Sequence, residues 1–299
     1  MTSPSRPRIG TLRALAGATV VAAAIVATIP MAAQAAVVSI PCAENALVEA
    51  INTANALPGS DTINLAAGCT YGLTSSHGDA GNGPDGLPVI TSVIELVGTP
   101  NIITRTGGSF RIAEVSSTGN FTLTRVTLDH GSTSGDGGGV LNRGAVTFTS
   151  AGSGLTNNAA GPGLLGLFTG TGGGLSNTDT PNGTAPAATF TGALVQGNTA
   201  GGRGGGIYNG TRSALTMTSS SVTQNSSTAA KGGGIAANSS TTSLTSTPVR
   251  VNHANALLVG GAGGVFRLGG TMTTVTSPIS ANTPNNCVGS SPAVPSCTG

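Results

Sequence analysis

Tryptophan is absent from this 299-residue sequence, and aromatic residues make up only 3% of it. Charged residues contribute 7% and hydrophobic residues 38%, which excludes a disordered tail, because such tails are far more charged and less apolar. The clustered lysines and arginines that contact phosphate groups are also missing, so we expect no nucleic-acid partner. The remaining composition, Val, Ile, Leu, Ala and Thr with 48 glycines, favours small side chains packed in β-strands.

The chain has one long apolar run, at its N-terminus, and no second run follows it. This N-terminal segment has the pattern of a secretory signal peptide. Arg6, Arg8 and Arg13 precede an uninterrupted stretch of small and apolar residues, 15–29, and Ala33-Gln34-Ala35 is a small-x-small cleavage site. A membrane anchor is the alternative, but the run is short for a span of about 20 residues. We therefore expect a signal peptide over residues 1–35, cleaved after Ala35, and a secreted, extracellular chain that is not held in a membrane.

Acidic residues are missing from the second half of the chain. Without the three arginines of the leader, nine basic and ten acidic residues remain, and all ten acids lie at or before Asp179. The cations that follow Asp179, with no acid after them in the sequence, are Arg203, Arg212, Lys231, Arg250 and Arg267. We expect a mildly positive surface there, too sparse for nucleic acid.

Cysteine is scarce, with four residues in the chain. In an exported protein they suggest two disulfides, for which three pairings are open. Cys42 and Cys69 flank the first structured segment, and Cys287 and Cys297 lie close together near the C-terminus, so pairing within each end is the favoured interpretation. A zinc site is the alternative, but no CxxC spacing or nearby histidine supports it. We expect neither a metal nor a cofactor.

A two-part signature recurs five times between residues 137 and 282. Its first part is a glycine cluster followed by an apolar anchor, and the anchors are Val140, Leu175, Ile207, Ile235 and Val265. Its second part is an apolar-x-x-Asn that follows each anchor, with the asparagines Asn158, Asn198, Asn225, Asn252 and Asn282. The anchors are 35, 32, 28 and 30 residues apart, a period typical of stacked units that cannot bury their apolar faces alone.

Each repeat supplies about three short strand-like runs separated by turns, with no room for a crossover helix. Coiling the chain on itself pairs each strand with its counterpart on the next coil, about 4.8 Å along the axis. The sequence therefore predicts an all-β, right-handed parallel β-helix, a solenoid in which the asparagines form a ladder and occupy the left-handed bend at one corner. Alternation in 120–128 shifts phase at Thr124-Arg125, which predicts a bend between two strands of one coil.

A short helix precedes these coils. Ala46, Leu47, Ala50, Ile51 and Ala54 have helical spacing, and Pro58-Gly59 would end the helix. Open strand edges at the end of a solenoid invite aggregation, so we expect this helix to cap the stack. The predicted organisation is a single domain, 36–299, with a helical cap at 36–60, coils at 61–282 and a disulfide-bonded tail at 283–299. Separate strands are expected at 89–96 and 102–105.

Residues 42–71, followed by Gly83-Pro-Asp-Gly-Leu-Pro-Val-Ile-Thr91, resemble the N-terminal segment of secreted actinobacterial right-handed β-helix proteins with the pectate-lyase-like fold. The glycine and asparagine elements are similar to repeats of the polymorphic outer membrane proteins, which typically have Phe where this chain has Val, Leu or Ile. The resemblance implies the fold. It leaves the function open, because that group includes adhesins as well as carbohydrate-active enzymes.

An enzymatic role needs paired carboxylates, or carboxylates with a base. Asp129-His130 with Asp136 is the local grouping that would serve a polysaccharide lyase or a glycoside hydrolase. The favoured interpretation of these residues is structural, since Asp and His often cap backbone amides in such Gly/Ser/Thr turns. Residues 77–86 would be a calcium loop in the same setting, but they lack EF-hand spacing, and a surface loop with solubilising aspartates is favoured.

A binding role has a more definite geometry. Arg203 and Lys231 each stand four residues before an anchor, so they should lie on neighbouring coils, where an anion would relieve their repulsion. Tyr208 follows an anchor by one residue, which alternation turns outward, beside Arg203. We expect a monomeric, non-enzymatic, extracellular structural or adhesion module that presents a polar surface to a glycan or a cell-surface protein; the alternative is the lyase or hydrolase.

Overall fold

The computed structural model describes residues 1–2, 35–161, 170–179, 183–255 and 261–299. Contacts divide the chain into two units, Met1–Ala32 and Ala33–Gly299, and the fold described below is that of the second. The expected signal peptide lies almost wholly outside the described residues. No helix in the described ranges is long and apolar enough to cross a membrane.

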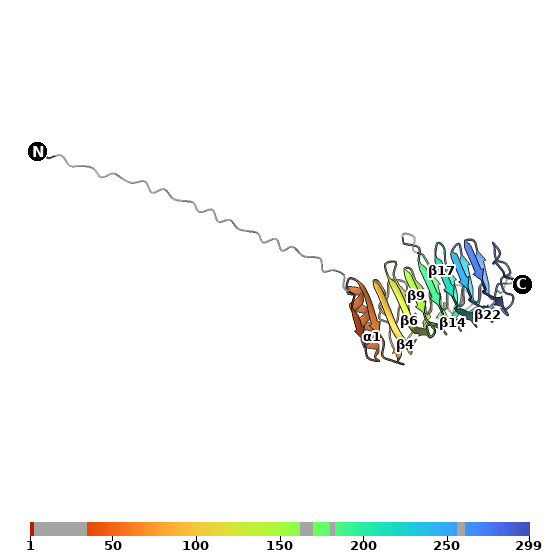
Figure 1. The fold of residues 1–299 in the computed structure, drawn as a ribbon, viewed down its shortest axis with the longest axis horizontal. Helices are drawn as coiled ribbons and strands as arrows, with labels where there is room; N and C mark the ends of the chain where they lie inside the picture. The colour runs from red at the N-terminus through yellow and green to blue at the C-terminus, as the bar shows by residue number, and fades with distance from the viewer. Residues whose placement is uncertain (3–34, 162–169, 180–182, 256–260) are drawn as a thin grey trace. The chain divides into compact units, whose positions relative to one another are not determined.

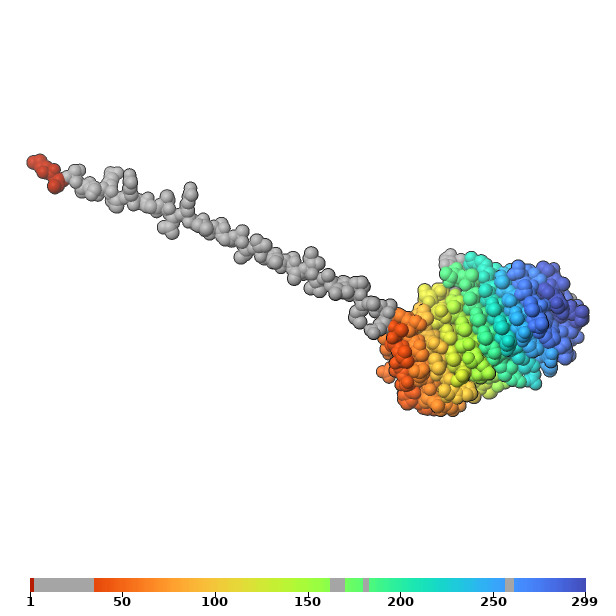
Figure 2. All heavy atoms as spheres, in the orientation of Figure 1, coloured from red at the N-terminus to blue at the C-terminus, as the bar shows by residue number. Residues whose placement is uncertain are grey.

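The unit Ala33–Gly299 is a stack of coils whose strands pair in parallel with their counterparts on the next coil (Figure 1). The coil that begins at Ile207 contributes four strands, namely β16 (Ile207–Asn209), β17 (Ala214–Thr218), β18 (Ser221–Thr223) and β19 (Ser226–Ser227). About three were expected, and the fourth is the two-residue strand after each ladder asparagine. Figure 2 shows the coils as consecutive bands from orange to blue. The prediction of an all-β parallel β-helix is confirmed.

Within the described residues the strands form three sheets. The anchor sheet, named for the apolar anchors in it, consists of β5 (Ala113–Val115), β8 (Val140–Asn142), β12 (Leu175–Asn177), β16, β20 (Ile235–Asn238) and β24 (Val265–Leu268). The short sheet consists of β7 (Ser132–Thr133), β11 (Ala159–Ala160), β15 (Thr199–Ala200), β19 and β23 (His253–Ala254). The long sheet folds around two walls of the coil and consists of β1 (Val37–Ser39), β2 (Ser60–Asn64), β3 (Thr70–Leu73), β4 (Val93–Arg105), β6 (Asn120–Asp129), β9 (Ala145–Thr149), β10 (Gly154–Thr156), β13 (Ala187–Thr191), β14 (Leu194–Gln196), β17, β18, β21 (Thr241–Thr245), β22 (Val249–Arg250), β25 (Thr271–Val275) and β26 (Ile279–Ser280).

The five anchors lie in one column of the anchor sheet. Register pairs each anchor with the next one along the stack, and every anchor is fully buried: Val140, Leu175, Ile207, Ile235 and Val265. Aromatic residues stack in the same way on the long sheet, where the rings of Phe148 and Phe190 are parallel with centroids 4.8 Å apart. Identical positions on successive coils therefore share one core, as the period predicts.

Strand β6 runs around a corner of the coil. Its first half pairs with β9 and its second half with β10, and between them Arg125 has a φ of 57°, so the predicted bend is confirmed. The expectation of two separate strands at 89–96 and 102–105 is wrong. Strand β4 is continuous there, because it follows β6 around the same corner and absorbs the bend in a register shift between Val97 and Asn101.

The asparagine ladder is present and buried. The side-chain amide of Asn198 donates to Oδ1 of Asn225 at 2.9 Å, and each coil repeats the contact. The left-handed residue, however, is the one before each asparagine, with φ of 54–67° at Asn157, Gly197, Gln224, Val251 and Ala281. The asparagine was expected to hold the bend, but none of the five ladder asparagines has a positive φ; each buries its side chain in the ladder, and the residue before it makes the bend.

At each position of a glycine cluster, a side chain would collide with a different neighbour. Gly204 has a φ of 72°, and a Cβ there would lie 2.3 Å from the carbonyl oxygen of Ile207. A Cβ on Gly205 would lie 2.4 Å from the carbonyl oxygen of Gly233 on the next coil, and one on Gly206 would lie 3.0 Å from the ladder side chain of Asn225. The cluster therefore curls over its own strand, against the next coil, and against the ladder.

Both ends of the stack are closed. Helix α1 (Glu44–Ala56) buries Leu47, Ile51 and Ala54 against the first coil, as expected of a cap. Cys42 pairs with Cys69, with Cα atoms 5.8 Å apart, and Cys287 pairs with Cys297, with Cα atoms 6.5 Å apart. Pairing within each end is confirmed. The tail lies on the last coil through bridges such as Ala262 to Asn285.

Candidate functional site

The outer face of the anchor sheet carries the polar and charged side chains that are candidates for function. The outward column, in register from coil to coil, is Glu114, Leu141, Ser176, Tyr208, Ala236 and Phe266. Most of these side chains are buried although they point out of the sheet; Phe266, for example, is 4% exposed. The glycine clusters fold back over the strands that they precede, so this face is a covered surface rather than a bare one.

A second column runs beside the first, at the start of each glycine cluster. The backbone N–H of Gly172 donates to the carbonyl of Arg203 at 3.0 Å, and that of Gly204 donates to the carbonyl of Lys231 at 3.4 Å. Arg203 and Lys231 therefore lie on neighbouring coils, as their spacing predicts. On the preceding coils the same column holds Asp136 and Thr171.

Both cations lie over the ring of Phe266. The guanidinium carbon of Arg203 is 5.5 Å from the ring centroid, and Nζ of Lys231 is 5.1 Å from it. An aromatic face attracts cations, so one ring offsets part of the repulsion between two like charges held on adjacent coils. This contact holds the two positive charges together at one end of the column.

A hollow of about 410 Å³ opens beside these cations. Thr171, Gly202, Arg203, Tyr208, Ala229 and Ala230 line it. Arg203 and Tyr208 thus share one cavity, as expected from the sequence, while Lys231 follows Ala230 on the next coil. The hydroxyl of Tyr208 accepts a hydrogen bond from Nδ2 of Asn238 at 3.2 Å, which fixes the ring edge and leaves the half-buried ring at the wall of the hollow.

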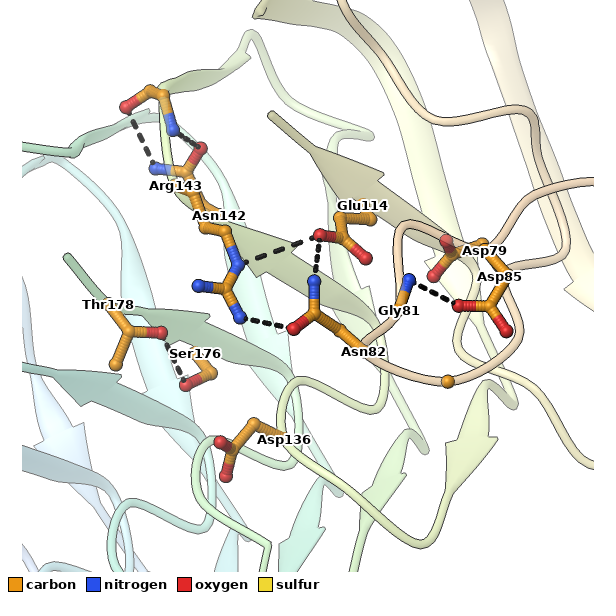
Figure 3. A network of polar contacts seen from close by, with 12 residues as sticks. Asp79, Gly81, Asn82, Asp85, Glu114, Asp136, Asn142, Arg143, Ser176 and Thr178 are labelled. Atoms are coloured by element: carbon orange, nitrogen blue, oxygen red, sulfur yellow. Dashed lines mark hydrogen bonds and ion pairs between the residues drawn. The ribbon is translucent and has the colours of Figure 1, made fainter. Parts of the chain in front are cut away.

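The other end of the face is acidic and closed by a loop (Figure 3). Nδ2 of Asn82 donates to Oε1 of Glu114 at 2.7 Å, and a guanidinium nitrogen of Arg143 donates to Oδ1 of Asn82 at 2.8 Å. Arg111, which lies 3.6 Å from Oε2 of Glu114, pairs with Asp85 at 2.7 Å, both side chains of this pair being fully buried. The interpretation of 77–86 as a solubilising surface loop is therefore wrong for Asp85, whose carboxylate is a buried partner of Arg111.

Burial dominates the acid–base behaviour of this cluster. Desolvation raises the pKa of Asp85 to about 7, against the opposing attraction of the Arg111 guanidinium. Desolvation also raises the pKa of Glu114, although Arg111 lies 3.6 Å away. Arg111 in addition donates to the carbonyl oxygens of Asn82, Gly83 and Asp136, so its main effect is to fix the loop on the face.

The candidate catalytic residues lie on two parts of the coil. Asp129 ends β6, where Oδ1 accepts from Thr156 at 2.6 Å and from Asn157 at 3.0 Å, and Oδ2 contacts the ring of His130. Burial opposes ionisation of Asp129, but these hydrogen bonds prevail and lower its pKa. Asp136 precedes the anchor sheet and accepts from the backbone and hydroxyl of Thr171 at 2.7 and 2.8 Å. Within the described ranges no hydrogen bond joins Asp129 to Asp136.

Two features of the face were missed from the sequence. Glu114 and Arg143 form an ion pair at 3.5 Å, and Asn82 bridges them. They lie on consecutive coils of the outward face. The repeat spacing, extended back to β5, would have predicted this position. A second ladder joins Asn142 to Asn177 at 2.7 Å and Asn177 to Asn209 at 2.8 Å, two residues after each of the first three anchors. Among the residues that the structure describes, no group of three or more His, Cys, Asp or Glu side chains is placed to hold a metal ion.

The stacked coils, the two closed ends and the polar face define a protein of the parallel β-helix class. Comparison with family models, with curated proteins and with solved structures finds no match. The particular function therefore has to be argued from the face itself.

Proposed function

We propose that this protein is an exported, non-enzymatic binding module that holds an acidic polysaccharide on the outer face of the anchor sheet. The observation that carries the proposal is the placement of Arg203 and Lys231 on adjacent coils, beside the hollow that Tyr208 lines. The bound groups would be uronate or sulfate substituents, which accept charge-assisted hydrogen bonds from both cations.

The chemistry of the hollow matches such a ligand. Arg203 offers a planar set of donors suited to a carboxylate or a sulfate, Lys231 offers a second charge one coil further along, and the ring of Tyr208 offers an apolar surface for a sugar. Acidic side chains are absent from the chain after Asp179, so none from that half opposes an anion. A linear polymer would lie along the stack, where equivalent positions recur every 4.8 Å or so.

Export is supported by separate observations. The N-terminal basic, apolar and small-x-small pattern is that of a signal peptide, and both disulfides close short loops at the ends of the stack. Disulfides of this structural kind persist in oxidising compartments outside the cytosol. A secreted chain with two closed ends and a covered polar face suits an adhesive or surface-binding role.

The test is a glycan array of uronate-rich, sulfated and neutral polysaccharides, read for the purified protein and for two charge reversals. Lys231→Glu should lower the affinity for acidic glycans by about 10-fold or more, because it replaces an attractive contact with a repulsive one. Arg250→Glu makes the same change in net charge on β22, outside the anchor sheet, and should change the affinity less than about 2-fold. Equal losses in the two variants would show only a general charge effect.

Tyr208→Ala and Arg203→Ala should each weaken the same interaction. If all of these variants bind acidic glycans as tightly as the wild type does, the proposal is wrong. The same array should also be examined for released sugar. Product whose formation depends on Asp129 or Asp136 would replace a binding role with the polysaccharide lyase or hydrolase.

A further inference from the structure

Asp61 is a buried carboxylate with an incomplete set of partners. It lies on β2, is 2% exposed, and its Oδ1 accepts a hydrogen bond from the backbone nitrogen of Ala36 at 2.9 Å. Its Oδ2 is also buried, and no group in the described part of the chain donates to it. A buried charge without a counter-charge is costly, so this carboxylate requires a partner that the described residues of the precursor do not supply.

Ala36 occupies a defined position at the edge of the first coil. The backbone N–H of Thr62 donates to its carbonyl at 2.8 Å, and its own nitrogen points to Asp61, so two hydrogen bonds hold it on β2. It lies directly after Ala33-Gln34-Ala35, the expected cleavage site. Ala36 and Asp61 both line an apolar pocket of about 310 Å³ formed by β1, α1 and β2.

We propose that cleavage between Ala35 and Ala36 creates the missing counter-charge, and that Asp61 is the receptor for the new N-terminal ammonium. Hydrolysis of this amide by water, catalysed by a signal peptidase during export, leaves a carboxylate on Ala35 and an amine on Ala36, which takes up a proton. The nitrogen that donated one hydrogen bond then carries three hydrogens and a positive charge. It pairs with Oδ1 and supplies a donor for Oδ2.

Processing and folding of the cap are coupled in this arrangement. The uncleaved chain buries Asp61 against a neutral amide, whereas the processed chain buries it in an ion pair. The other carboxylate lining the pocket is Glu49 of α1, which is exposed and adds to the negative potential around the ammonium. On the neighbouring strand, Glu95 follows the residue paired with Asp61 and accepts a hydrogen bond from Thr124.

The sign of the pH dependence follows from the pairing. An ion pair stabilises the charged amine, so its pKa in the folded protein is raised above the value of about 7.7–8.0 for a free α-amine. The resulting stability is fully present below that value and is lost as the pH rises through the raised folded pKa. Loss of the pair should therefore appear at alkaline pH.

The experiment uses the whole precursor, expressed in an exporting bacterial host and collected as the processed protein. Mass spectrometry should place the N-terminus at Ala36. Limited acylation then reports on the amines, and Lys231, the single lysine of the sequence, serves as an internal reference. The labelling rate of the α-amine plotted against pH gives its pKa without any substitution, and we expect a value at least one unit above that of a free α-amine, hence labelling slower by about 5-fold or more at pH 8.

Asp61→Asn should restore the labelling rate of a free α-amine, whereas Glu49→Gln, which removes the exposed carboxylate of the same pocket, should change the rate less than about 2-fold. An N-terminus other than Ala36, or an α-amine that titrates near 8 in the wild type, would overturn the inference whether or not the variants fold. Glycan binding plays no part in this experiment, so its failure leaves the proposed function untouched.

Discussion

Asn225 and Asn252 are joined by two hydrogen bonds to the same atom. The backbone nitrogen and Nδ2 of Asn225 both donate to Oδ1 of Asn252 at 3.0 Å, and Nδ2 also donates to the carbonyl of Val195 at 3.0 Å. Asn225 is 1% exposed, so water does not replace these contacts. Each coil is thus tied to the next through a buried amide as well as through its strands.

Substitution of Asn225 by Ala should lower the free energy of unfolding by about 3–4 kcal/mol. The change removes the donor to Val195 and to Asn252, and it also removes the acceptor that serves the backbone and Nδ2 of Asn198. Urea unfolding followed by circular dichroism measures the loss. Asn238→Ala, which removes a half-buried amide that contacts Tyr208, should cost less than about 1 kcal/mol. Equal costs would show that the ladder adds nothing to the strand pairing.

The residue before the ladder asparagine Asn252 is β-branched and strained. Val251 has a φ of 57° and is 55% exposed, and a β-branched side chain is disfavoured in this left-handed region. Val251→Gly or Val251→Asn should raise the free energy of unfolding by about 1 kcal/mol, because both residues adopt this conformation more readily. Val275→Asn, at an exposed strand position without a positive φ, should give no gain. A midpoint of Val251→Asn at or below that of the wild type would contradict the prediction.

The fold was predictable where the signal is local or periodic. The anchors recur 28–35 residues apart, each is followed by a ladder asparagine, and the apolar residues of the cap helix have helical spacing; physical chemistry assigns each pattern to one kind of element. Cysteines that are close in sequence at each end led to the correct pairing. The bend at Arg125 followed from a shift in alternation.

The candidate site was predictable only in part. The stacking of Arg203 on Lys231 followed from the repeat. Their shared contact with Phe266 did not, because the repeat spacing does not show how far a long cationic side chain extends from its own coil toward a ring on another coil. The pairing of Asp85 with Arg111 also escaped prediction. Those residues are 26 positions apart, in a loop that lies before the first complete repeat.

Asp85 makes stability depend on pH in a defined direction. Its pKa rises from an ordinary value of 3.8 to about 7 on folding, so between these limits the folded chain binds more protons than the unfolded chain. The contribution of this group therefore falls as the pH rises from about 4 to about 7, by on the order of 3 kcal/mol. Urea unfolding at intervals between pH 4.5 and 7.5 measures the slope.

Asp85→Asn should reduce that slope, because the amide does not titrate, and the part that remains comes from Glu114, whose pKa burial also raises. Asp129→Asn is the matched control. The pKa of Asp129 is lowered by its hydrogen bonds, so the stability it contributes is lost only as the pH falls below the ordinary value for aspartate, and the slope above pH 4.5 should persist. A slope that is the same in the wild type and in Asp85→Asn would contradict the assignment.

Phe266 should determine how well the two cations bind an anion together. Its ring lies under both Arg203 and Lys231, so Phe266→Leu keeps an apolar side chain in the buried position but removes the aromatic face that attracts the charges. The cations would then separate to reduce their repulsion, and affinity for an acidic polysaccharide should fall about 3- to 10-fold, measured by calorimetry at low salt. Phe266→Tyr retains an aromatic face and should bind like the wild type if the hydroxyl reaches solvent. Thermal unfolding distinguishes a change in the site from a change in the fold, and undiminished affinity in a folded Phe266→Leu variant would show that the ring does not organise the cations.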